Sequence, residues 1–123
     1  AHPALAGTAI APALLLGRLF RAFGADATIF PNHGGRFGYS LATCTAIAAA
    51  AREPLGNLHP AMPVPAGGMR VDRVDEMLAL FGPDTMLLIG GNLLEAGDGL
   101  EARAAAFATR VREAGGDAGR IEQ

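Results

Sequence analysis

Two glycine pairs carry the clearest chemical signal in the sequence. Gly67 and Gly68 follow the apolar run 62–65, and Gly90 and Gly91 follow the apolar run 86–89. Short apolar runs of this kind are typical of buried parallel strands, and glycine at a strand end lets backbone N–H groups approach an anion closely. One such pair is usually only a tight turn. Two pairs in equivalent positions predict a single phosphate held between neighbouring strand ends, to which the side-chain amide of Asn92 is expected to contribute.

The glycine-rich segment 31–39 is the second candidate for chemistry, because it contains His33, Arg36 and Tyr39. His33 is interpreted either as a general acid or hydrogen-bond donor, or as an ordinary solvated loop histidine. The guanidinium of Arg36 is suited to clamping a carboxylate or a second phosphate, and the alternative is a salt bridge that anchors the loop. For Tyr39, packing against the following helix is favoured over stacking on a substrate.

The remaining reactive groups are assigned structural roles. Cys44 lies in an alanine-rich helical pattern, which favours a buried structural thiol over a nucleophile. His59, in a linker, is also interpreted as structural. All ten basic residues are arginine, which excludes a Schiff base or a lysine general base within this chain.

Length and composition limit the protein to certain classes. The 123 residues suffice for one domain, whereas a complete (β/α)8 barrel needs about 250. The net charge of −2 gives no general attraction to nucleic acid or to an anionic membrane, so neither is expected as a partner. One cysteine, no signal sequence and no apolar run of about 18 residues predict a cytoplasmic protein. Since no strand precedes His2, we expect a piece of a longer protein.

The order of elements predicts an α/β fold with parallel strands. Helical patterns over 12–23, 40–52, 71–81 and 100–111 alternate with short strands at 26–30, 62–65 and 85–89. Strict alternation with crossover helices implies parallel strands and right-handed connections.

Local signals define the ends and faces of these helices. Gly24 and the pair Gly82 and Pro83 are expected to end helices, and Ser40 is expected to cap one. Arg18 and Arg21 are placed on the solvent side of the first helix. The inward face of the second helix is predicted to contain Leu41, Cys44, Ile47 and Ala48. Residues 92–99 are predicted to form a loop, and the chain after Gly115 a fraying tail.

The segments 2–4, 24–30, 63–68 and 88–92 together resemble the C-terminal barrel of the RuBisCO large-chain superfamily, and most closely its RuBisCO-like branch (form IV). The resemblance implies that residues 1–123 form part of a (β/α)8 TIM barrel, about strands six to eight. It implies that the four glycines of the two pairs bind a substrate phosphate and that the loop 31–39 closes over the substrate. It also places His2 beside the substrate.

Departures from the family pattern argue against carboxylation. The strand-six loop has Arg36 but no lysine, Ala66 stands where a serine precedes the first glycine pair, and Pro3 replaces an arginine. The resemblance further implies Mg²⁺, held by a carbamylated lysine and acidic residues that lie outside this chain.

The leading hypothesis is therefore a RuBisCO-like enzyme whose substrate is a phosphorylated ketose or oxo acid sugar. Enolisation, isomerisation or decarboxylation would proceed through a Mg²⁺-stabilised enediolate, with His2, His33 and Arg36 as catalytic residues. The expected partners are the rest of the barrel and, in the complete protein, a second copy in a homodimer. The alternatives are a non-catalytic anion-binding or inactive piece that needs a partner, and a true ribulose-bisphosphate carboxylase relative. The chain alone is expected to be inactive.

Overall fold

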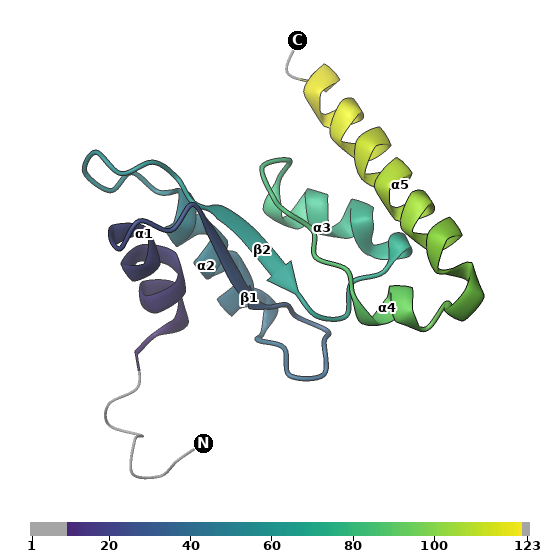
Figure 1. Ribbon diagram of the computed structural model, residues 1–123. Coiled ribbons are helices and arrows are strands. Elements are labelled where there is room, and N and C mark those ends of the chain that lie inside the picture. Colours follow the sequence, from purple (N-terminus) through teal and green to yellow (C-terminus); the bar gives the residue numbers. More distant parts are fainter. Residues whose placement is uncertain (1–9, 122–123) are drawn as a thin grey trace.

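A computed structural model describes residues 10–121, with side chains described up to residue 116, and confirms the α/β pattern (Figure 1). The two strands are β1 (Ala27–Pro31) and β2 (Met62–Ala66). The α-helices are α1 (Phe20–Ala22), α2 (Leu41–Arg52), α3 (Val74–Phe81), α4 (Gly91–Leu94) and α5 (Leu100–Ile121). A π-helix, η2 (Ala13–Leu19), and two 3₁₀ turns, η3 (Val71–Arg73) and η4 (Gly97–Gly99), complete the described elements.

The sheet has two parallel strands in register, with Ala27 opposite Met62 and Pro31 opposite Ala66. The predicted strand at 85–89 is wrong as a regular element, because this segment makes only one parallel bridge, between Leu88 and Ala66. The segment nevertheless runs alongside β2, so the chain keeps the predicted order of parallel segments.

The prolines of β2 explain why the third ladder does not extend. The carbonyl of Pro63 accepts a hydrogen bond from the Met86 N–H at 3.1 Å, so Pro63 and Pro65 direct their backbone groups toward the segment 85–89. Met62 directs its N–H the other way, to Asp26 on the β1 side, at 2.8 Å. Because proline has no N–H, β2 can accept hydrogen bonds from the third segment but cannot donate any to it at these two positions.

The N-terminal helix packs closely on α2 at Gly17. A β-carbon at this position would overlap the side chain of Ala50, so the two helices approach more closely than any larger residue would allow. Arg18 is exposed as predicted, but the expectation that Arg21 faces solvent is wrong, because Arg21 is buried. Both side chains nevertheless reach the end of α2, since Arg18 pairs with the Glu53 carboxylate and Arg21 donates to the Glu53 carbonyl at 2.8 Å. Gly24, at φ +98°, follows the helix end as predicted.

Helix α2 supplies much of the core. The Ser40 side chain accepts a hydrogen bond from the Thr43 N–H at 3.2 Å, which confirms the predicted N-cap. Cys44, Ile47 and Ala48 are buried as predicted, whereas the prediction for Leu41 is wrong, since this first residue of the helix is 44% exposed.

The thiol of Cys44 is structural. It lies 3.4 Å from the Pro31 carbonyl oxygen, and burial raises its pKa, which disfavours the nucleophilic thiolate. Across the core, the rings of Phe30 and Phe81 pack edge to face with centroids 6.0 Å apart.

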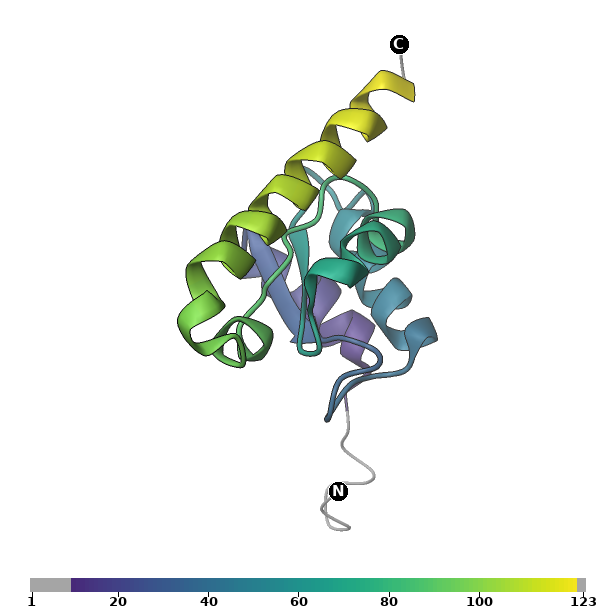
Figure 2. The same ribbon diagram turned by 90° about the vertical axis from the view of Figure 1, so that its right-hand side faces the viewer.

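The C-terminal part differs from the prediction at two places. Helix α3 ends at Gly82, at φ +83°, as expected. The predicted loop 92–99 instead contains the short helix α4 and the turn η4, and α5 continues past Gly115 to Ile121, where a fraying tail was predicted. Alanine, the strongest helix former, recurs along α5 and sustains it. Helix α5 lies beside α3 and extends beyond the sheet (Figures 1 and 2). Within residues 10–121, no helix is long and apolar enough to cross a membrane.

Candidate functional site

The two glycine turns border one cleft with a volume of about 880 Å³. Six residues that the sequence singled out line it together, and they come from three segments far apart in the chain: His33, Gly67, Gly68, Gly90, Gly91 and Asn92. Its lining residues follow the ends of both strands and include the start of α4, and Figure 1 shows α4 near these strand ends. The structure thus brings the predicted anion-binding turns to one place.

The backbone of the first turn requires glycine. Gly67 has a φ of +100° and Gly68 a φ of +67°, in the left-handed region that residues with a β-carbon rarely adopt. Gly90 has a φ of −142° and a ψ of −81°, and Gly91 begins α4. Among residues 10–121, no acceptor is found for the amide hydrogens of Gly68, Gly90 and Gly91. These three donors are therefore available to a ligand.

His33 is held in the cleft by contacts to both nitrogens of its ring. Its Nδ1 lies 3.0 Å from the Asn32 Oδ1, which also accepts the His33 backbone N–H at 2.9 Å. Its Nε2 lies 3.2 Å from a carboxylate oxygen of Glu76. Asn32 is completely buried, and its side-chain N–H donates to the sulfur of Met77 at 3.1 Å. The imidazole is thus oriented by residues of two different elements.

Arg73 and Glu76 also line the cleft, and the sequence analysis missed them. The Nε of Arg73 donates to the Glu76 carboxylate at 3.2 Å, and hydrogen bonding to this guanidinium is the main cause that lowers the pKa of Glu76. Their i, i+3 spacing directly after a glycine pair is the signal that could have identified them. Arg70 lines the same cleft and pairs with the exposed Asp72 at 3.1 Å.

Acidification is expected to release this cluster. Because the folded pKa of Glu76 lies below its ordinary value of 4.5, the ionised carboxylate stabilises the fold fully above that pH, and its contribution is lost as the pH falls through the folded pKa. Hydrogen exchange of the amides at 33–38, followed from pH 6 to pH 3 in the complete protein, should therefore accelerate beyond the intrinsic pH trend below about pH 4.5. Glu76→Gln should remove this additional change. An identical profile in the variant would contradict the assignment to Glu76.

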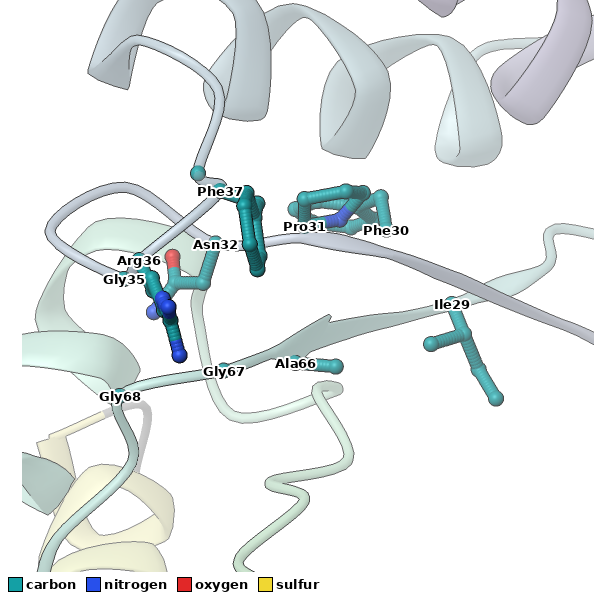
Figure 3. A pocket seen from close by; sticks show the side chains of 11 residues that line it. Ile29, Phe30, Pro31, Asn32, Gly35, Arg36, Phe37, Ala66, Gly67 and Gly68 are labelled. Atoms are coloured by element: carbon teal, nitrogen blue, oxygen red, sulfur yellow. The ribbon is translucent and has the colours of Figure 1, made fainter. Parts of the chain in front are cut away.

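Arg36 does not reach the cleft. It lines a neighbouring pocket of about 400 Å³ that shares Gly67 and Gly68, and its side chain points from the loop toward these glycines (Figure 3). Its guanidinium lies 5.3 Å from the ring centroid of Phe37, a cation–π distance. No salt bridge joins it to another residue within 10–121, so the loop-anchoring alternative finds no partner there.

The other predicted residues lie away from the cleft. Tyr39 is partly buried and packs against the hydrophobic core, in agreement with the preferred interpretation. His59 is exposed, and its carbonyl accepts a hydrogen bond from Arg21 at 3.2 Å. His2 and Pro3 lie outside the described residues.

The side chains of the described residues do not form a metal site by themselves. No group of three or more histidine, cysteine or acidic residues within 10–121 is placed to hold a metal ion. Near the cleft, Glu76 is already engaged by Arg73 and His33. This donor set does not fit the coordination of Mg²⁺, which requires several oxygen ligands around one point.

Comparisons with known proteins point to one family. No family model matches the sequence. Over 112 residues the chain is 61% identical to 5-methylthioribulose-1-phosphate isomerase of Rhodospirillum rubrum, covering 90% of this chain and 30% of that protein. It is 58% identical over 116 residues to ribulose bisphosphate carboxylase-like protein 1 of Rhodopseudomonas palustris, covering 94% of this chain and 32% of that protein. It is 31% identical over 118 residues to 2,3-diketo-5-methylthiopentyl-1-phosphate enolase of Geobacillus kaustophilus, covering 90% of this chain and 29% of that protein.

Solved structures agree in fold. A Rubisco-like protein from Rhodopseudomonas palustris has a TM-score of 0.75 at 53% identity, covering 90% of this chain and 29% of that chain. The octameric ribulose-1,5-bisphosphate carboxylase/oxygenase of Pyrococcus horikoshii OT3 has a TM-score of 0.72 at 25% identity (82% and 24%). The chain spans about 30% of the length of the curated relatives that it matches, several of which are named as enzymes. By sequence and by fold, this chain belongs to the RuBisCO-like proteins and corresponds to the C-terminal part of their TIM barrel.

Proposed function

We propose that the complete protein binds the phosphate of a phosphorylated ketose in the cleft between the two glycine turns and catalyses an isomerisation next to its carbonyl group. The observation that carries the proposal is that Gly68, Gly90 and Gly91, whose amides have no acceptor among the described residues, line one cleft together. A phosphate accepts charge-assisted hydrogen bonds from such amides, and these are stronger than bonds between neutral groups.

The charges around the cleft support an anionic ligand. Arg70 and Arg73 line it, and His33 lines it too, with its ring nitrogens in contact with Asn32 and Glu76. His33 would donate a hydrogen bond or a proton to a substrate oxygen by exchanging its contact with Glu76 for that oxygen, and Arg36 would contact a substrate group from the adjacent pocket. His2 lies outside the described residues, and its catalytic role stays a proposal.

Isomerisation is favoured over enolisation by the degree of similarity. Identity is 61% to a protein named 5-methylthioribulose-1-phosphate isomerase and 31% to a protein named as an enolase. We therefore name 5-methylthioribulose 1-phosphate as the first substrate to test. Magnesium remains part of the proposal only with ligands outside this chain, and no step is assigned to it here.

We propose that the rest of the barrel, in the same polypeptide, packs against this part. Ile29 is 59% exposed, Met86 49% and Leu88 46%, an apolar surface at the strands that further strands would cover. A homodimer of the complete protein is proposed with it.

The test is turnover by the complete protein. Purified protein with 5-methylthioribulose 1-phosphate should yield the isomerised product, followed by proton NMR in deuterated water, and the dephosphorylated sugar should be a poor substrate. Equal turnover of both sugars would contradict the phosphate site. Binding of the phosphorylated sugar without any turnover would favour the non-catalytic, anion-binding alternative. Carbon dioxide fixation into ribulose bisphosphate is not expected.

A further inference from the structure

Arg73 touches both loops that border the cleft. Its Nη1 donates to the Gly68 carbonyl at 3.1 Å, and its Nη2 donates to the His33 carbonyl at 3.3 Å. The third donor, Nε, is bound to Glu76, whose second carboxylate oxygen faces the His33 ring. One guanidinium therefore joins the loop that follows β1, the turn that follows β2 and the start of α3.

Two glycines lie against this guanidinium. A β-carbon at Gly68 would lie 3.3 Å from the Nη1 of Arg73, and one at Gly34 would lie 3.6 Å from the Nη2. Both glycines have positive φ angles, +67° and +75°. The Arg73 side chain is only 14% exposed, so most of it is enclosed by the loops that it joins.

We infer that Arg73 is a positioning residue of the anion cleft: it fastens the loop 32–39 to the Gly67–Gly68 turn and thereby fixes both the turn amides and the His33 ring. The expected effect of Arg73 on phosphate binding rests on the proposed function. The hydrogen bonds by which Arg73 joins the two loops are present without any ligand. Its three donors form a planar fork that reaches three acceptors at once. A lysine ammonium, with its donors on one atom, cannot span them.

Arg70 is the matched control, because it borders the same cleft with the same charge. Its side chain is 58% exposed and pairs with Asp72, two residues away. It makes no hydrogen bond to the loop 32–39 within the described residues. Removing Arg70 therefore tests the loss of charge alone, whereas removing Arg73 tests charge and fastening together.

The first measurement needs no ligand. In the complete protein, Arg73→Met should accelerate hydrogen exchange of the amides at 33–38 at least tenfold, and Arg73→Lys should accelerate it nearly as much. Arg70→Met should leave this exchange unchanged. Wild-type exchange in Arg73→Lys would show that charge suffices and would overturn the inference. If Arg73→Met does not fold, the comparison of Arg73→Lys with Arg70→Met decides.

The second measurement is the affinity for inorganic phosphate by calorimetry. Arg73→Met and Arg73→Lys should each weaken phosphate about tenfold, and Arg70→Met about twofold. Equal weakening by Arg70→Met and Arg73→Met, with Arg73→Lys unaffected, would reduce Arg73 to a charge and contradict the inference. If the wild-type protein does not bind phosphate while exchange in the Arg73 variants is faster, the proposed function fails and the fastening stands.

Discussion

Gly90→Val in the complete protein is expected to weaken phosphorylated ligands about a hundredfold and to leave a non-phosphorylated analogue nearly unaffected. A bulky side chain at the cleft would keep a phosphate away from the amides of this turn. Each charge-assisted hydrogen bond is worth about 1.5–3 kcal/mol, so the loss of one or two accounts for a factor of this size. Isothermal titration with the phosphorylated sugar and its dephosphorylated form would measure both effects.

The open space around Gly90 suits this position to a substitution that tests binding. No atom lies within 4 Å of the position that a β-carbon would take at Gly90, so there is space for a side chain, although its φ of −142° and ψ of −81° lie outside the extended and helical regions. Gly115→Val is a matched control, because Gly115 also has open space around it but lies in α5, away from the cleft. If both ligands weaken equally in Gly90→Val, the glycine serves the fold and not the phosphate.

The second large effect is expected from Arg21→Met, which should destabilise the complete protein by about 3–4 kcal/mol. Arg21 is 2% exposed and donates to the carbonyls of Ala50, Glu53, Leu58 and His59. Two of these acceptors belong to the last turn and cap of α2, where a cation is also favoured by the helix dipole. Methionine fills similar volume but leaves these carbonyls without their donor.

Arg18→Met provides the control for this experiment. Arg18 comes one turn earlier and pairs with Glu53 at the surface, where ion pairs contribute little to stability. Urea unfolding should therefore show a clearly lower midpoint for Arg21→Met and a nearly unchanged one for Arg18→Met. Similar midpoints for the two variants would mean that the Arg21 bonds are replaced by water.

The sequence was sufficient to predict the parts of the fold that depend on local chemistry. The helix ends at Gly24 and Gly82 depend on positive φ angles, which glycine adopts easily. The cap at Ser40 depends on one hydrogen bond to a residue nearby in the sequence. Both could therefore be predicted from the sequence alone. The two glycine turns were predicted to meet because parallel strands finish at the same edge of a sheet. The structure places them around one cleft.

Features that depend on long-range geometry were missed. The burial of Arg21 depends on carbonyl acceptors far along the chain, those of Ala50, Glu53, Leu58 and His59. The third strand was predicted from its apolar run, but its pairing depends on β2, whose prolines lack donors. Arg73 was not singled out from the sequence, since its contacts to two distant loops exist only in the folded chain.

The prolines of β2 also have a consequence for how the cleft can move. The two glycine turns lie on opposite sides of the boundary between β2 and the segment 85–89, and this boundary is held by few backbone bonds. Because of Pro63 and Pro65, the pairing of β2 with the segment 85–89 is weaker than the continuous pairing of β1 with β2. The Gly90–Gly91 turn is therefore expected to be more mobile than the Gly67–Gly68 turn. Ligands of different size would then displace mainly the Gly90–Gly91 side of the cleft and leave the Gly67–Gly68 side in place.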